Sequence, residues 1–231
     1  MRSARISARP GAPAQEALAP GTHPLRLGNG RDGVLVVPPG IAAAAGAPLL
    51  VALHGAGGTG RQMAQLLTTE AARRGILVLA PDSRGTTWDV IRGGYGPDVA
   101  FLDEALAAVF ARFAVGSVAV SGFSDGASYA LSIGLANGDL FGHVLAWSPG
   151  FMAPPDLAGR PRVFVSHGTG DRVLPIDRCS RRLVPVLRAD GYDVRYEEFD
   201  GGHVVPPDLL AASLDRLDNG ITGSEAGRAP L

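Results

Sequence analysis

Ser124 has the sequence context that best fits a chemical role in this chain. It is the central residue of Gly122-Phe123-Ser124-Asp125-Gly126, a Gly-x-Ser-x-Gly pattern between the apolar run 118–120 and the helical pattern 127–133. A sharp turn from strand to helix lifts a serine hydroxyl clear of the sheet edge, and flanking glycines avoid collisions with the adjoining strand and helix. We therefore predict that Ser124 is a nucleophile, the alternative being a loop serine without chemistry.

A histidine that could activate this serine follows the last predicted strand. A serine hydroxyl is a poor nucleophile unless a base takes its proton and a third group orients that base. His203 lies in Gly201-Gly202-His203, just after the pattern 194–199, where a loop can return it to the sheet edge. We predict that His203 is the base, the alternative being a loop histidine that caps the last helix. Structural or peripheral places are expected for the other histidines, which are His23, His54, His143 and His167.

A carboxylate between the serine and the histidine in chain order would complete a catalytic triad. Asp171 follows the predicted strand 162–166 through a turn-rich exit, which suits this role. Asp177 is the competing candidate, but it falls inside the next predicted helix. We expect the remaining candidates to be solvated turn residues, namely Asp156, Asp193 and Asp200.

Backbone N–H groups that stabilise a negative oxygen are expected in two places. One is the N–H of Asp125, which follows the nucleophile. The other is the N–H of Ala56, in the loop His54-Gly55-Ala56-Gly57-Gly58 after the predicted strand 49–53. An ordinary glycine-rich turn is the alternative interpretation of that loop.

The same loop also fits a different class of protein. Residues 55–60 match G-x-G-x-x-G between a predicted strand and helix, and Asp82 ends the next predicted strand, as in a dinucleotide-binding fingerprint. An NAD-binding oxidoreductase is therefore one alternative function, although it leaves Ser124, Asp171 and His203 unexplained. A catalytically inactive hydrolase scaffold used for binding is the other.

Short apolar runs alternate with longer amphipathic ones, which predicts an α/β fold with a mostly parallel twisted sheet and helices on both faces. We expect strands at 33–37, 49–53, 76–80, 118–121, 144–147, 162–166 and 194–199. Helices are expected at 60–74, 98–113, 124–136, 176–190 and 206–216. The chain of 231 residues is long enough for one such domain, assigned to residues 23–218, with a loose leader at 1–22 and a flexible tail at 219–231.

The composition restricts the possible chemistry. All 21 basic residues are arginines, so a Walker P-loop lysine, a Schiff-base lysine and a Ser-Lys dyad are excluded. Cys179 is the single cysteine and is expected to be a packed residue. The net charge of -1 offers no basic footprint for nucleic acid or anionic lipid. We expect a cytoplasmic protein without a cofactor, metal site or membrane anchor, whose partner is a small-molecule ester.

These motifs resemble those of the α/β-hydrolase superfamily over about 33–217. Residues 81–88 and 98–102 are similar to polyhydroxybutyrate depolymerase and feruloyl esterase-like proteins. Residues 166–175 and 202–206 resemble the phospholipase/carboxylesterase branch, which includes acyl-protein thioesterases. Both branches imply ester hydrolysis by a Ser-His-Asp triad without a cofactor. Ala127 stands where many relatives have a second glycine, and this departure leaves the triad intact.

The loops suggest what kind of ester would fit. The segment 148–159 is too short for a large helical lid, so we expect a minimal lid or none and an open pocket. Four apolar side chains are predicted to line it, namely Trp88, Trp147, Phe151 and Val173, although ordinary packing could equally explain the aromatic ones. Such a pocket favours short-chain, soluble acyl esters over long lipid chains.

Overall fold

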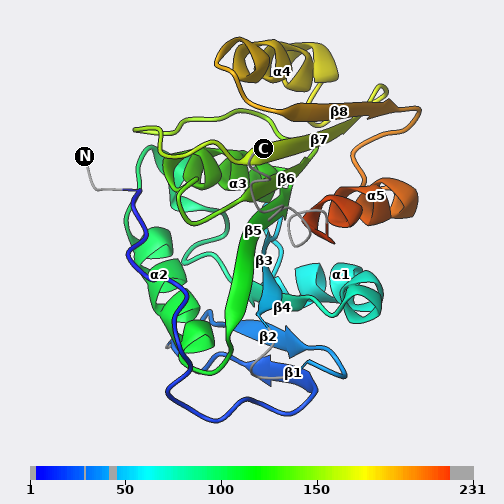
Figure 1. Cartoon of the computed structure of the whole chain (residues 1–231). Helices are drawn as coiled ribbons and strands as arrows, with labels where there is room; N and C mark the ends of the chain where they lie inside the picture. The colour runs from blue at the N-terminus through cyan, green and yellow to red at the C-terminus, as the bar shows by residue number, and fades with distance from the viewer. Residues whose placement is uncertain (1–3, 29, 42–45, 219–231) are drawn as a thin grey trace, which may run out of the picture.

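An eight-stranded sheet forms the centre of the structure, a computed structural model that describes residues 4–28, 30–41 and 46–218 (Figure 1). The strand order is β1-β2-β4-β3-β5-β6-β7-β8. The first two strands are antiparallel to their neighbours, and all later pairs are parallel. The strands are β1 (Gly21–Pro24), β2 (Gly33–Val37), β3 (Ala47–Leu53), β4 (Leu77–Pro81), β5 (Val115–Phe123), β6 (His143–Trp147), β7 (Arg162–Gly168) and β8 (Val194–Phe199).

Helices cover both faces of the sheet (Figure 1). They are α1 (Gly60–Arg74), α2 (Pro97–Phe110), α3 (Asp125–Ala136), α4 (Ser180–Ala189) and α5 (Pro207–Asp218), with short 3₁₀ turns at Asp89–Arg92 and Ile176–Arg178. Successive side chains of a strand point to opposite faces, and β3 shows this clearly. Leu49, Val51 and Leu53 join the apolar core under α2, α3 and α4, whereas Leu50 and Ala52 join the core under α1 and α5.

The sequence predictions of fold and elements are confirmed with small shifts at the element ends. Strand β1 was not expected, because its sequence Gly-Thr-His-Pro has no alternating apolar pattern. The helix expected at 176–190 divides into a 3₁₀ turn and α4. Residues 149–158 contain neither helix nor strand, in keeping with the absence of a helical lid.

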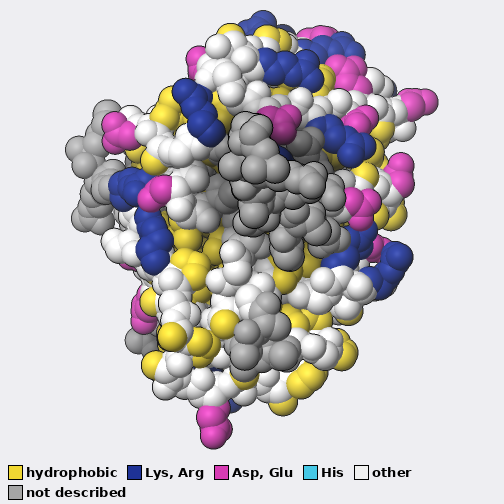
Figure 2. Space-filling model, viewed as in Figure 1, with side chains coloured by type: hydrophobic (Ala, Val, Ile, Leu, Met, Phe, Trp, Pro, Cys, Tyr) yellow, Lys and Arg dark blue, Asp and Glu magenta, His cyan; other side chains and the backbone are white. Residues whose placement is uncertain are grey.

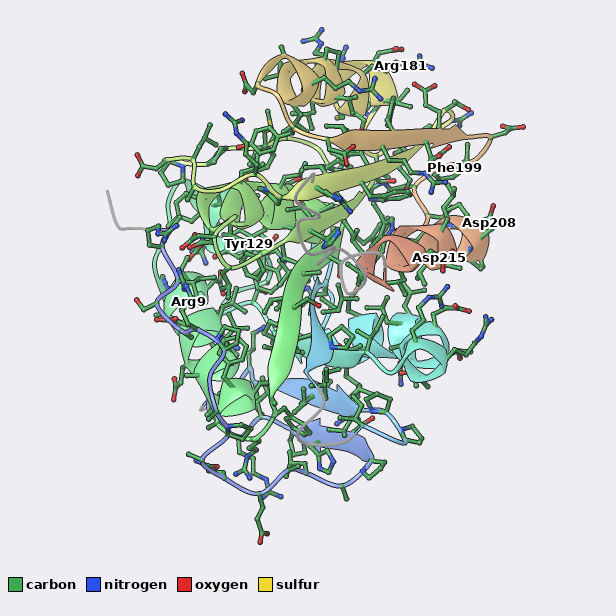
Figure 3. All side chains as sticks on the ribbon, viewed as in Figure 1. Arg9, Tyr129, Arg181, Phe199, Asp208 and Asp215 are labelled. Atoms are coloured by element: carbon green, nitrogen blue, oxygen red, sulfur yellow. The ribbon has the colours of Figure 1, made fainter. Side chains whose placement is uncertain are left out.

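The prediction of a loose leader at 1–22 needs correction. From residue 4 onward this stretch, called here the N-terminal segment (4–20), is attached to the helices on the α2 and α3 face (Figure 1). Ala4 and Ile6 are each 1% exposed, and the Ile6 N–H donates to the Asn137 side chain at 2.9 Å. The Asp139 carboxylate accepts from Arg5 at 2.8 Å and from Arg9 at 2.6 Å. Arg9 is labelled in Figure 3. The tail expected at 219–231 lies outside the described residues.

Arginines on the surface form ion pairs with neighbouring carboxylates. Arg181 on α4 contacts Asp177 at 2.8 Å and Glu198 at 2.6 Å (Figure 3). On the face seen in Figure 2, basic and acidic side chains are interspersed. No helix in the described part of the chain is both long and apolar enough to cross a membrane.

Candidate active site

Ser124 sits in a strained turn between β5 and α3. Its φ of 57° and ψ of -120° are rare for a residue with a side chain, and such strain persists only where the surroundings impose it. A Cβ on Gly122 would lie 2.2 Å from the carbonyl oxygen of Gly126, and one on Gly126 would lie 2.2 Å from that of Leu53. Both glycines are therefore required by the close approach of α3 to β5 and β3, as the sequence pattern predicts.

The structure brings the predicted serine, histidine and carboxylate together at the carboxyl ends of β5, β7 and β8. The His203 Nε2 lies 2.8 Å from the Ser124 Oγ, and the His203 Nδ1 lies 2.6 Å from the Asp171 Oδ2. A carboxylate can only accept, so Nδ1 carries the proton and Nε2 is free to accept from the serine hydroxyl. We call this rim, with its loops, the serine edge.

Asp171 is oriented by its own loop. Its Oδ1 accepts the N–H groups of Val173 at 2.8 Å and Leu174 at 2.9 Å, which leaves Oδ2 to face His203. Burial by itself would raise the pKa of the Asp171 carboxyl. The hydrogen bonds from Leu174, His203 and Val173 outweigh burial and lower that pKa, so the carboxylate stays charged. The competing candidate Asp177 is exposed and pairs with Arg181 instead.

His167 is a buried neighbour of Asp171. It is fully buried, and its Nε2 donates to the Leu174 carbonyl at 2.8 Å, while its Nδ1 accepts from the Ser180 hydroxyl at 2.7 Å. The Nε2 also lies 3.3 Å from the Asp171 Oδ2. Burial lowers the pKa of His167 and favours the neutral ring that these bonds need. The sequence analysis interpreted His167 as structural, and the structure gives it a defined partner at the serine edge.

The glycine loop after β3 lies against the serine. A Cβ on Gly55 would be 3.4 Å from the Ser124 Cβ. The Ala56 N–H forms no hydrogen bond with any described residue. The N–H of Asp125 begins α3 and is likewise unpaired among the described residues, as expected at a helix start. Both predicted N–H donors are therefore available to a ligand.

His54 fixes this loop. Its Nδ1 donates to the Gly55 carbonyl at 2.7 Å, and its Nε2 accepts the Ser83 N–H at 3.0 Å. This arrangement requires the neutral ring, and burial lowers the pKa of His54. The His54 carbonyl in turn accepts from the Trp88 indole at 2.8 Å.

Two threonines join the glycine loop to the serine turn. The Thr86 carbonyl accepts the Gly57 N–H at 2.7 Å, and the Thr87 hydroxyl donates to the Asp125 carboxylate at 2.6 Å. Adjacent residues thus hold the two backbone segments that carry the predicted N–H donors. The sequence analysis missed this role, because nothing in the types or spacing of Thr86 and Thr87 indicates their partners.

The predicted pocket residues need correction. Trp88 is 1% exposed and stacks on Tyr129 at 5.0 Å, and Trp147 is fully buried in the core under α1 and α5. Neither tryptophan can line an open pocket, since large aromatic side chains pack the core where space is available. Phe151 is half-buried and Val173 is exposed, so both stay predictions. Phe123 was missed, although its ring lies 4.7 Å from that of His203.

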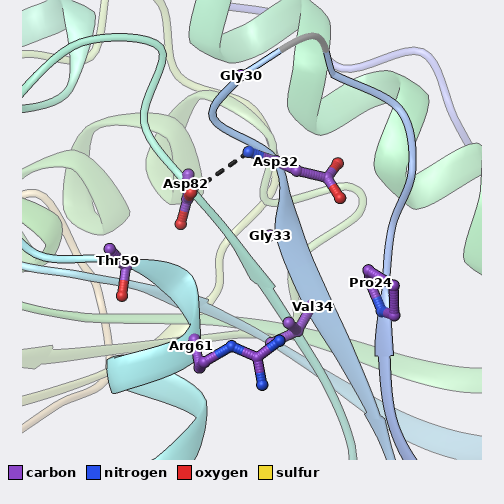
Figure 4. Close-up of a pocket in the computed structure, with 8 residues that line it drawn as sticks. All are labelled: Pro24, Gly30, Asp32, Gly33, Val34, Thr59, Arg61 and Asp82. Atoms are coloured by element: carbon purple, nitrogen blue, oxygen red, sulfur yellow. Dashed lines mark hydrogen bonds between the residues drawn. The ribbon is translucent and has the colours of Figure 1, made fainter.

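The dinucleotide-like glycines have a structural explanation. A Cβ on Gly60 would be 1.9 Å from the Ala80 carbonyl oxygen, so the glycine allows α1 to contact β4. The Asp82 carboxylate accepts the N–H groups of Gly60 at 2.7 Å and Asp32 at 3.3 Å (Figure 4). Thr59 caps the same helix end. This carboxylate occupies the position where a pyrophosphate would bind, so the geometry does not favour an NAD site.

Solved structures of esterases share this architecture. Esterase PE8 matches with a TM-score of 0.66 and 25% identity, covering 81% of this chain and 97% of that one. A ferulic acid esterase from Anaeromyces mucronatus matches at 0.63 with 18% identity, covering 90% and 95%. Zea mays acyl-protein thioesterase 2 matches at 0.56 with 19% identity, covering 88% and 98%. No protein-family model and no curated protein matches the sequence. The structural matches confirm the predicted fold.

Proposed function

We propose that this chain, an α/β-hydrolase, is a carboxylesterase-type serine hydrolase that acts on small, soluble acyl esters. The observation that carries the proposal is the hydrogen-bonded series from Asp171 through His203 to Ser124, formed by residues from three strand ends. Structural similarity to esterases and a thioesterase supports the same reaction class. A merely structural serine would need neither the strained turn nor an oriented imidazole.

In the first half of the reaction, Ser124 Oγ attacks the ester carbonyl carbon while His203 Nε2 takes the hydroxyl proton. The carbonyl oxygen becomes negative and accepts the N–H groups of Ala56 and Asp125. Asp171 stabilises the imidazolium that forms. The bond to the alkoxy oxygen then breaks as His203 returns the proton to it, so an alcohol leaves and the acyl group stays on Ser124.

In the second half, water replaces the alcohol. His203 takes a proton from the water as its oxygen attacks the acyl carbon, and the same N–H groups hold the negative oxygen. Collapse of this intermediate breaks the bond to Ser124 Oγ, which recovers its proton from His203. The acid is released and the enzyme is restored without any cofactor. Phe151 and Val173 remain predicted to line the substrate pocket.

The test combines labelling with turnover. A fluorophosphonate probe should label the wild type and not Ser124→Ala, because only an activated hydroxyl reacts. Turnover of p-nitrophenyl acetate should disappear in that variant, with unfolding by urea unchanged. Across a p-nitrophenyl series from acetyl to palmitoyl, kcat/KM should be highest for short chains. Equal labelling of both proteins would refute the function, and a maximum at palmitoyl would refute only the preference.

A further inference from the structure

An apolar cavity of about 260 Å³ lies beside the serine edge, and the reaction steps described above do not use it. Its walls include the glycine loop, the first turns of α1 and the residue before the nucleophile. The lining residues include Gly55, Ala56, Met63, Leu66 and Phe123. Pockets that enclose drug-sized ligands measure about 300–1,000 Å³, so this one suits a small group.

The cavity shares walls with the reacting centre. Gly55 approaches the Ser124 Cβ closely, Ala56 carries a proposed oxyanion donor, and the Phe123 ring packs against His203. Leu66 is 44% exposed and lines the open side of the cavity, next to the buried Met63. A ligand held by Ser124 could therefore reach this space directly.

The position of His203 decides which part of an ester would enter. In the tetrahedral intermediate the alkoxy oxygen must face His203 Nε2 to receive its proton, whereas the acyl chain points away from the histidine. Phe123 and Val205, which follows His203 closely in sequence, both pack against the core under α1 and α5. Phe151 and Met152 pack against the other core, under α2, α3 and α4. Because Phe123 lines the cavity and its ring contacts that of His203, the cavity lies on the alkoxy side.

We propose that this cavity binds the alcohol portion of the substrate, as a small alkyl or phenyl group. The inference rests on the proposed ester hydrolysis and adds to it a specificity for the leaving alcohol. Each methylene that enters the cavity should raise kcat/KM roughly 3- to 4-fold, as expected for burial of apolar surface. The gain should end when the cavity is full.

The test varies the two halves of the ester separately. With acetate esters of methanol, ethanol, butanol and hexanol, kcat/KM of the wild type should rise to butyl. In Leu66→Trp, which fills the cavity, the ratio of butyl to methyl acetate should fall towards one. The ratio of methyl butyrate to methyl acetate should keep its wild-type value. Val186→Trp, at a comparably exposed position on α4, is the matched control and should keep both ratios.

A second measurement uses the reverse direction. When an added alcohol replaces water, its oxygen bonds to the acyl carbon, the bond to Ser124 Oγ breaks, and His203 passes the alcohol's proton to the serine. Butanol should capture the acyl group more efficiently than methanol in the wild type, and this preference should be lost in Leu66→Trp.

The outcomes separate the two proposals. A flat alcohol series in a wild type that does hydrolyse methyl acetate through Ser124 would overturn the alcohol site alone. So would a Leu66→Trp variant that changes the acyl ratio instead. If the wild type hydrolyses no ester in either series, the proposed function itself is overturned.

Discussion

The serine edge and the N-terminal segment are stabilised by different kinds of contact. At the serine edge, backbone atoms approach so closely that Gly122 and Gly126 admit no side chain, and buried neutral histidines fix the loops. The N-terminal segment buries Ala4 and Ile6, and its polar contacts include surface carboxylates, namely Asp103 and Asp139. Substitutions at the serine edge should therefore lower kcat or the free energy of unfolding far more than substitutions in the segment.

The largest effect is expected from Asp171→Asn. The asparagine oxygen can still accept the N–H groups of Val173 and Leu174, which places an NH₂ group opposite His203 Nδ1. Nδ1 must then accept, so the proton moves to Nε2 and faces Ser124, the wrong tautomer for a base. We expect kcat to fall by about 10⁴, as for other triads. Initial rates of ester hydrolysis at saturating substrate would measure this fall in kcat. Asp177→Asn is the control and should retain activity.

Gly126→Ala should have the next largest effect. A methyl group there meets the carbonyl oxygens of Leu53 and His54 at 2.2 and 2.5 Å, and backbone cannot yield as a flexible side chain can. We expect a loss of about 3 kcal/mol or more in the free energy of unfolding. Gly94→Ala is the matched control, because its added methyl meets nothing within 4 Å. Equal urea midpoints for the two variants would contradict the argument.

Mild acid should weaken the serine edge before the N-terminal segment. Burial lowers the pKa values of His54 and His167, so below about pH 6.5 the unfolded chain binds protons that the folded chain does not, and stability falls as pH falls. Hydrogen bonds from Arg5 lower the pKa of Asp139, so its contribution is lost only below about pH 3.9. Urea unfolding at pH 7, 6 and 5 should show a smaller decline for His167→Gln than for the wild type. Asp139→Asn should decline as the wild type does.

The smallest effect is expected from Asp139→Asn. Its ion pairs with Arg5 and Arg9 join side chains that are about two-fifths exposed, and such pairs contribute less than about 1 kcal/mol. Thermal unfolding should therefore shift slightly, with kcat and KM unchanged. A tenfold loss of kcat/KM would show that the segment also controls the reacting centre.

The same contrast explains what the sequence could predict. Ser124, Asp171 and His203 were identified because strand ends and turn residues are local patterns, and the topology of parallel strands brings those ends together. The attachment of the N-terminal segment was missed because its partners, such as Asn137 and Asp139, lie more than 90 residues away and their carboxylate and amide groups carry no pattern. Trp88 and Trp147 were misplaced because aromatic residues near loops suit a pocket and a core equally well.

Helix α3 connects the two regions. Ser124 precedes its first residue, and Arg5 donates to the carbonyl oxygen of Ala136 at its last, about 18 Å away at 1.5 Å per residue. Every residue from Gly126 to Ala136 is buried, so the helix is held along its length as well as at its two ends. Its direction is therefore fixed by packing along its whole length, and loss of a surface contact at residues 4–9 should leave the N–H group of Asp125 where it is.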